Sequence, residues 1–235
     1  MALTGPTLAG PTMAPAKAPA THLVVLVHGY GADGQDLIGL AQHWQGLLPT
    51  VAFVAPNAPT RVPGGPGYQW FPISRIDPHE MRQGVEVAAP ALDEYLDAEL
   101  ARLGLPPERL ALVGFSQGTM LSLYLGPRRK VRPAAIVGFS GLLAGAPPAD
   151  GEIPPVFLTH GDNDQVIPPQ AMFAAATELG RAGAAVQWHL APGMGHGIDP
   201  EGLAIAGQFL SLAFQGRLKN AGEIRSVYKP SRRIG

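Results

Sequence analysis

The sequence predicts an α/β fold built on a doubly wound, mainly parallel sheet, in a single domain without a large lid. Two observations support this prediction. Short, apolar, β-branched runs alternate along the chain with segments whose apolar residues recur at helical spacing. The 235 residues are 46% hydrophobic and only 15% charged, so most of the chain can fold around one large core. Strands connected through helices pair in parallel, and ligands bind at their carboxyl ends.

Each expected element has its own local signal. Continuous apolar runs predict strands over residues 22–27, 51–55, 110–113, 134–139, 155–160 and 186–190. Amphipathic spacing predicts helices over residues 37–44, 80–103, 120–125, 168–182 and 200–214, with Asp36 and Asp199 as N-caps. Pro90 lies inside the second helix, so we expect a kink or a restart there.

The segment 56–78 is rich in Pro and Gly but carries the aromatic residues Tyr68, Trp70 and Phe71. Aromatic side chains in a loop of this length form either a packed cover or a wall that contacts substrate. The sequence leaves both alternatives open.

The two ends of the chain differ from the rest in composition. Residues 1–20 are rich in Pro and Ala, and we predict a flexible leader with a short edge strand as an option. They lack the basic start and apolar block of a signal peptide. Residues 21–216 form the predicted α/β domain, and residues 217–235 form a flexible, basic polar tail. No apolar run approaches the ~20 residues of a membrane span, so we expect no stable membrane insertion and a cytoplasmic location.

Composition also excludes several classes of function. The net charge is −1 and no basic block is present, which argues against nucleic-acid binding. The chain has no cysteine, so disulfides, a thiolate nucleophile and cysteine-ligated zinc are excluded. No histidine pair has metal-ligand spacing with a carboxylate. We therefore predict neither a metal nor a cofactor.

The most informative stretch is Gly114-Phe-Ser-Gln-Gly118, which lies between a predicted buried strand and a short apolar helix. Strand, G-x-S-x-G and helix together indicate a nucleophile elbow, a sharp turn that exposes a serine hydroxyl above the sheet. Glycine is needed at both ends because a Cβ at Gly114 or Gly118 would collide with the neighbouring strand or helix. The helix then directs its N-terminal amides at an oxyanion beside Ser116.

A catalytic triad is predicted from three loops, each of which follows a core strand, in chain order. Ser116 comes first, a pair of aspartates follows 48 residues later at Asp164 with Asp162 beside it, and His196 lies another 32 residues on. Ser…Asp…His is the order of the α/β-hydrolase arrangement. An imidazole must take the serine proton and return it to the leaving group, while a carboxylate fixes its tautomer. His196 is flanked by glycines, which suits a base on a loop.

Asp164 is our candidate for the triad carboxylate. It lies farther from the strand end and precedes an apolar segment that can anchor the loop, whereas Asp162 follows Gly161 and suits a turn. For His28 and His160, each before a glycine at a strand end, we expect a structural hydrogen bond rather than base catalysis.

An oxyanion hole needs two backbone amides. One is expected from Gln117, the residue after the nucleophile. The loop after residue 27 offers the other at Tyr30, beside two glycines.

With these residues assembled, the chain resembles the phospholipase/carboxylesterase family, small α/β-hydrolases that include bacterial carboxylesterases and acyl-protein thioesterases. The resemblance spans about residues 23–214 and rests on the segments 27–34, 36–38, 55–59, 69–71, 114–118, 160–168 and 195–196. It implies Ser116, Asp164 and His196 as the triad, Tyr30 and Gln117 as oxyanion donors, and a substrate site near Trp70. The leader, the tail, Pro90 and the segment 63–67 depart from the pattern.

The predicted function is a serine carboxylic-ester hydrolase that acts through an acyl-enzyme on short- to medium-chain, small-molecule esters. An acyl-thioesterase or a lysophospholipase with the same triad is the alternative. A hydrolase-fold binding protein without turnover is disfavoured because all three triad candidates are present, and a peptidase because no extra domain gates peptides. A homodimer is open as well, since the surface around Trp70 could be a dimer contact or a pocket lip.

Overall fold

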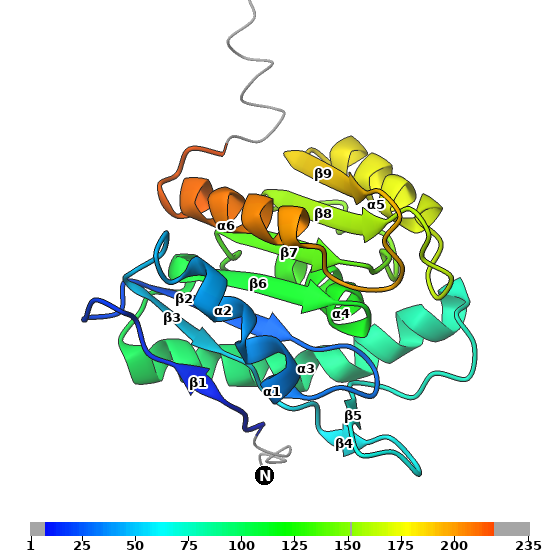
Figure 1. The fold of residues 1–235 in the computed structure, drawn as a ribbon, viewed down its shortest axis with the longest axis horizontal. Coiled ribbons are helices and arrows are strands. Elements are labelled where there is room, and N and C mark those ends of the chain that lie inside the picture. The colour runs from blue at the N-terminus through cyan, green and yellow to red at the C-terminus, as the bar shows by residue number, and fades with distance from the viewer. Residues whose placement is uncertain (1–7, 151, 219–235) are drawn as a thin grey trace, which may run out of the picture.

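A seven-stranded sheet forms the centre of the computed structural model, which describes residues 8–150 and 152–218 (Figure 1). The strand order is β1-β3-β2-β6-β7-β8-β9, and every pair is parallel except β1 with β3. The strands are β1 (Thr12–Met13), β2 (His22–Val27), β3 (Val51–Val54), β6 (Leu110–Phe115), β7 (Ala135–Phe139), β8 (Val156–Gly161) and β9 (Val186–Ala191). The predicted fold class is confirmed.

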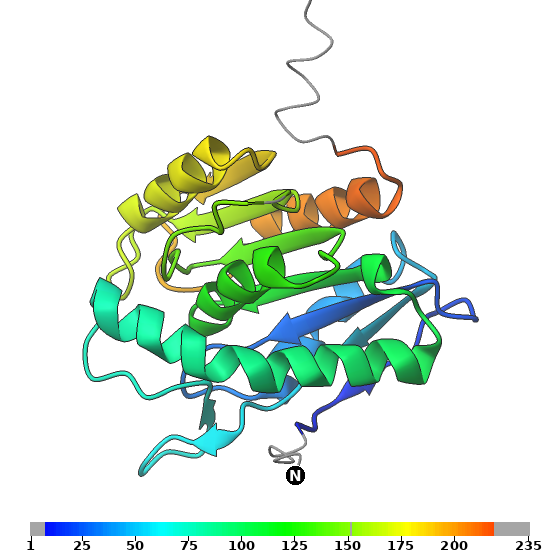
Figure 2. The same cartoon turned by 180° about the vertical axis from the view of Figure 1, so that it is seen from behind.

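Helices cover both faces of the sheet. The first face carries α1 (Gly34–Ile38), α2 (Leu40–Trp44) and α6 (Pro200–Phe214), and the other, seen in Figure 2, carries α3 (Pro78–Leu103), α4 (Gln117–Leu125) and α5 (Gln170–Arg181). Short 3₁₀ turns, Pro107–Arg109 and Gly126–Arg128, flank β6 and α4. Along β2, Val24 packs into the first layer and Val25 into the second. Strands covered on both faces therefore appear in the sequence as unbroken apolar runs.

The first two predicted helices differ from the structure in their capping and continuity. The N-cap of α1 is Asp33, whose side chain accepts from the amides of residues 35 and 36, and Asp36 completes a capping box from the N3 position. The expected 37–44 helix is two short helices that meet at Gly39. α3 begins at Pro78 after the Asp77 cap and continues through Pro90 as one 26-residue helix, so the predicted restart does not occur.

Much of the predicted leader is part of the packed domain. β1 pairs with the Phe53–Val54 end of β3. The Ala55 amide donates to Pro11 O at 3.0 Å, the Asn57 amide donates to Ala9 O at 2.9 Å, and Leu8 is buried. The optional edge strand is therefore present. The prediction of a flexible leader over residues 1–20 is wrong for residues 8–13, which pack against the sheet. Residues 1–7 of the predicted leader and residues 219–235 of the predicted tail lie outside the described residues.

The Pro/Gly-rich segment folds into a hairpin that is attached to the loop after β2. Its strands are β4 (Thr60–Arg61) and β5 (Tyr68–Gln69). The Gly31 amide donates to Tyr68 O and the Tyr68 amide donates to Ala32 O, both at 2.8 Å. Trp70 and Phe71 follow β5 and are buried. For these two rings the structure corresponds to the packed cover.

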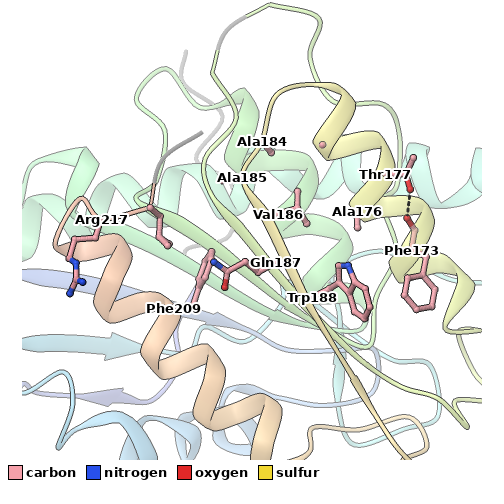
Figure 3. A pocket seen from close by; sticks show the side chains of 12 residues that line it. Phe173, Ala176, Thr177, Ala184, Ala185, Val186, Gln187, Trp188, Phe209 and Arg217 are labelled. Carbon is pink, nitrogen blue, oxygen red and sulfur yellow. Dashed lines mark hydrogen bonds between the residues drawn. The ribbon is translucent and has the colours of Figure 1, made fainter. Parts of the chain in front are cut away.

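A large groove lies along the edge strand β9 (Figure 3). It has a volume of about 770 Å³ and is bordered by Phe173 on α5, Phe209 on α6 and Trp188 on β9. Its β9 residues come from the first half of that strand, away from the carboxyl ends where α/β sheets bind ligands. No helix in residues 8–150 and 152–218 is both long and apolar enough to cross a membrane.

Candidate active site

Ser116 occupies a strained backbone position between β6 and α4. Its φ is 51° and its ψ is −114°, a region that residues with a side chain rarely adopt. A Cβ on Gly114 would lie 2.4 Å from Gly118, and a Cβ on Gly118 would lie 1.8 Å from Val27 O. The strand and helix therefore meet too closely for any side chain at either glycine. The predicted elbow is present with the serine at its apex.

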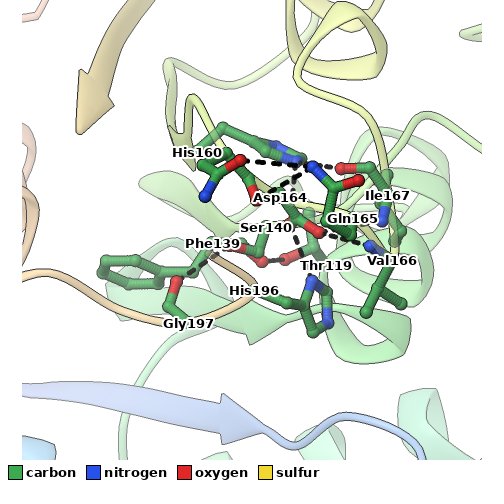
Figure 4. A network of polar contacts seen from close by, with 11 residues as sticks. Thr119, Phe139, Ser140, His160, Asp164, Gln165, Val166, Ile167, His196 and Gly197 are labelled. Carbon is green, nitrogen blue, oxygen red and sulfur yellow. Dashed lines mark hydrogen bonds and ion pairs between the residues drawn. The ribbon is translucent and has the colours of Figure 1, made fainter. Parts of the chain in front are cut away.

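His196 and Asp164 meet at the carboxyl edge of the sheet (Figure 4). The distance between His196 Nδ1 and Asp164 Oδ2 is 2.7 Å. Asp162 instead accepts from the Gly193 amide at 2.7 Å and so joins the two loops. The structure thus pairs the histidine with Asp164 and gives Asp162 a structuring contact.

The Asp164 carboxylate accepts three hydrogen bonds and has one further imidazole beside it. Oδ1 accepts from the amides of Val166 (2.8 Å) and Ile167 (3.0 Å), and Oδ2 accepts from His196 and lies 3.1 Å from His160 Nε2. Burial opposes ionisation, but the hydrogen bonds from His196, Ile167 and Val166 outweigh it and hold the Asp164 pKa below its ordinary value. An ionised Asp164 requires the proton of His196 on Nδ1. Nε2 of His196 is then free to act as a base.

The loop that carries His196 is fixed from β7. Ser140, the residue after that strand, has a φ of 47° and donates from Oγ to Gly197 O at 2.8 Å. The His196 ring also packs on Phe115, with 5.1 Å between ring centroids. Phe115 directly precedes Ser116, so the imidazole lies against the elbow. Within residues 8–150 and 152–218, no hydrogen bond joins the Ser116 hydroxyl to His196; such contacts often tighten only when substrate binds.

The two predicted oxyanion donors flank the serine. Gln117 opens α4, where a helix leaves its first amides without an internal acceptor. The loop carrying Tyr30 lies against the elbow, because a Cβ on Gly29 would be 3.2 Å from the Ser116 Cβ. In the described part of the chain, neither the Tyr30 amide nor the Gln117 amide donates to a backbone carbonyl. Both remain available to an oxyanion.

The side chain of Gln117 has a role that the sequence did not indicate. It is buried, accepts from the Trp70 amide at 2.8 Å through Oε1 and donates to Phe71 O at 2.8 Å through Nε2. Gln117 therefore ties the cover segment to the elbow across 46 residues of chain. Trp70 is 3% exposed, so its indole is neither a dimer contact nor a pocket lip, and its predicted contact with substrate stays a prediction.

His28, at the start of the loop that carries Tyr30, holds that loop and the cover segment in place. Its Nε2 accepts from the Ala58 amide at 3.0 Å, which places the proton on Nδ1, 2.7 Å from Gly29 O. Burial lowers the pKa of His28, against smaller opposing effects of Gly29 O and nearby carboxylates. The Trp70 indole in turn donates to His28 O at 3.0 Å. The predicted structural role of His28 is confirmed by these contacts.

Ser140 is another residue whose contact sequence reasoning missed, although one signal was present: Gly138-Phe-Ser140 at the end of β7 repeats Gly114-Phe-Ser116 at the end of β6. For His160, a structural hydrogen bond was predicted, and Nε2 makes one with Ile167 O at 2.8 Å. Its second contact, with Asp164, was not predicted.

Comparison with known proteins gives a match over most of the chain. A family model described as phospholipase/carboxylesterase matches residues 8–214. The chain belongs to the phospholipase/carboxylesterase family. It is therefore a serine hydrolase of the α/β-hydrolase superfamily, as the sequence predicted.

Named relatives of this family member are esterases and thioesterases. It is 30% identical to acyl-protein thioesterase 1 of Gibberella zeae over 85% of this chain and 94% of that one. It is 28% identical to the esterase YpfH of Escherichia coli, over 80% and 81% of the two chains. The crystal structure of esterase PE8 superimposes with a TM-score of 0.82 at 43% identity, covering 87% of this chain and 98% of that one.

Proposed function

We propose that this family member hydrolyses carboxylic esters through an acyl-enzyme formed on Ser116. The observation that carries the proposal is the Asp164–His196 hydrogen bond of 2.7 Å beside a serine held at a φ of 51°. Ser116 Oγ attacks the ester carbonyl carbon while His196 Nε2 accepts its proton. The protonated imidazole then donates this proton to the leaving alkoxide, and water attacks the acyl-enzyme by the same route in reverse.

The oxyanion of each tetrahedral intermediate is assigned to the amides of Tyr30 and Gln117. Both flank Ser116, and α4 adds the positive end of its dipole. Removing one such donor typically raises the barrier by ~3 kcal/mol. Because the donors are backbone groups, the loop positions matter more than the side chains at these two residues.

An apolar cavity supports short to medium acyl chains as the substrate class. Its volume is about 300 Å³, at the small end for ligand pockets, and Ile76, Met81, Leu142, Leu143 and Ala175 line much of it. Leu142, which lines the cavity, directly follows Gly141, and Gly141 lies against the elbow because a Cβ on it would be 3.0 Å from Ser116 O. We place the acyl tail in this cavity, with the carbonyl above Ser116.

The test is turnover of p-nitrophenyl butyrate by the full chain. We expect a burst of p-nitrophenol, labelling of Ser116 by a fluorophosphonate probe, and loss of both in Ser116→Ala. Turnover retained in that variant would reject the assignment. Folded wild-type protein that neither turns over nor labels would instead favour a binding protein.

Thioester hydrolysis is the second candidate, and the 30% identical relative named acyl-protein thioesterase 1 favours it. The same triad acts on both classes, because both pass through an acyl-enzyme. Oxygen and sulfur esters of one acyl group, graded in chain length, separate the two by kcat/KM. Chain-length preference beyond what the cavity holds would argue against our placement of the acyl tail.

A further inference from the structure

A second imidazole lies against the carboxylate of Asp164. His160 is at the carboxyl end of β8, in register with Leu190 of β9, and its side chain is 1% exposed. Its Nε2 lies 2.8 Å from Ile167 O and 3.1 Å from Asp164 Oδ2 (Figure 4). Both neighbours are acceptors, so Nε2 carries the proton. Nε2 donates it to Ile167 O, and the positive end of the N–H group lies close to Asp164 Oδ2 as an electrostatic contact.

These contacts close a ring around the carboxylate that consists of two hydrogen bonds and one electrostatic contact. His160 donates to Ile167 O, the Ile167 amide donates to Asp164 Oδ1, and Asp164 Oδ2 faces His160 again. Rotation of the carboxylate would break contacts on both oxygens at once. One support, His160, belongs to a strand paired on both sides, so the ring is attached to the sheet rather than to a loop.

We infer that His160 is a positioning residue that orients Asp164 toward His196 and moderates the negative charge that His196 experiences. The inference rests on the proposed function, because it needs the Asp164–His196 pair to act in catalysis. Ile167 O alone would satisfy the buried Nε2 proton. The additional approach to Oδ2 places a polarised N–H group beside the same oxygen that binds His196.

Two consequences distinguish this role from a merely structural one. Loss of the His160 N–H group beside Asp164 Oδ2 leaves more negative charge facing His196. This charge stabilises the imidazolium form of His196. The acid limb of kcat/KM, which reports the base in the free enzyme, should then move to higher pH. Asp164, His196 and His160 are the titratable groups that meet in this cluster, and the contact of Asp162 is with the Gly193 amide.

The experiment compares His160→Phe, which keeps a ring without a donor, with His160→Gln, which keeps an N–H at similar reach. Activity on p-nitrophenyl butyrate is measured from pH 5 to 9 and divided by the concentration of sites titrated with a fluorophosphonate. For His160→Phe we expect a loss in kcat per titrated site of roughly 10- to 100-fold, a small change in KM, and an acid limb raised by roughly 0.5 unit. His160→Gln should restore most of the rate and the limb.

His189→Phe is the matched control. His189 pairs with a carboxylate in a similar way, Nε2 to Asp199 Oδ2 at 3.2 Å, but at the N-terminus of α6. This variant should lower the melting temperature without changing the rate per titrated site or the acid limb.

Each other outcome overturns a defined part of the reasoning. If His160→Phe matches the wild type per titrated site with an unmoved limb, His160 is structural only. If His160→Phe does not fold, His160→Gln decides, and a tenfold loss with a normal melting temperature overturns the role of the N–H donor. Failure of the proposed function shows itself separately, as unlabelled wild type or an active Ser116→Ala variant.

Discussion

Replacing Asp164 by asparagine exchanges one carboxylate oxygen for an amino group in a site where three hydrogen-bond donors and the N–H group of His160 converge. Oδ1 accepts from the amides of Val166 and Ile167, and Oδ2 faces His196 and His160. An amide can accept on one side only. Whichever way the side chain turns, its NH₂ group points at two N–H donors.

The magnitudes decide which orientation is adopted. Turning the NH₂ group toward Val166 and Ile167 leaves one part-buried and one buried backbone donor unpaired, at up to ~1–3 kcal/mol each. Turning it toward the imidazoles costs less, because His160 still donates to Ile167 O and His196 can move its proton from Nδ1 to Nε2. We therefore expect the second orientation. His196 then has the wrong tautomer and cannot take the Ser116 proton.

A triad in the wrong tautomer typically loses ~10⁴ in kcat, which corresponds to about 5.5 kcal/mol. Stability should fall much less, by ~1–3 kcal/mol, and a domain of this size loses roughly 2–4 °C in melting temperature per kcal/mol. Steady-state kinetics on p-nitrophenyl butyrate and a thermal melt measure the two effects. We expect a folded protein with a rate near the Ser116→Ala background.

The stability difference between the two proteins should also depend on pH. The Asp164 pKa lies below its ordinary 3.8, so the ionised carboxylate stabilises the fold above that value and this stabilisation is lost as the pH falls through the folded-state pKa. The difference in unfolding free energy between wild type and Asp164→Asn should therefore shrink in acid. A difference that is constant from pH 7 to 3 would contradict the assigned ionisation state.

Asp162→Asn serves as the matched control for Asp164→Asn. Asp162 Oδ1 accepts from one amide, that of Gly193, and asparagine keeps an oxygen at this position. We expect the rate within roughly threefold of the wild type, because hydrogen bonds to the loop are retained. The reasoning is refuted if Asp164→Asn stays within tenfold of the wild type, or if Asp162→Asn is equally inactive.

Three further outcomes follow from other contacts. Gln117→Leu leaves the amide of Trp70 and its neighbouring carbonyl without partners, so unfolding in urea should show a loss of ~2–4 kcal/mol; wild-type stability would contradict the tether. Gly118→Ala places a Cβ 1.8 Å from Val27 O, and we expect little folded protein by circular dichroism, whereas Gly180→Ala, in open space, should fold normally. Burial and, second, Arg109 lower the pKa of His22 from 6.5 to about 4, so stability should fall as the pH drops through that window. His22 is only half-buried, so its contribution is reduced by solvent screening. Between pH 7 and 4, the loss of unfolding free energy measured from urea midpoints should be ~1 kcal/mol smaller in His22→Asn than in the wild type.

Local sequence patterns were sufficient to predict the turn that carries Ser116. Strand 110–115, the glycines on either side of Ser116 and the following helix all lie within one short stretch, and their steric requirements are local. The order of Ser116, Asp164 and His196 along the chain added the rest, because parallel strands bring the loops after them to one edge. Such inferences need only neighbouring residues and the connectivity of the sheet.

Contacts between distant segments were not predictable in this way. A capping choice between Asp33 and Asp36 depends on where the helix begins within one turn, and both residues have the side chain of an N-cap. The packing of residues 8–13 on β3 involves a segment whose Pro-rich composition resembles that of a flexible leader. In both cases the tertiary structure selected one of several locally acceptable states.

The sequence by itself determined the sheet, the elbow and the three residues proposed for the triad, because each depends on periodicity, on sterics within one turn, or on chain order. Only the tertiary structure decided that Gln117 holds the cover segment, that Ser140 holds the His196 loop and that His160 faces Asp164. These contacts join side chains to groups up to 57 residues away. Their direction is set by packing across strands and loops, which no local pattern records.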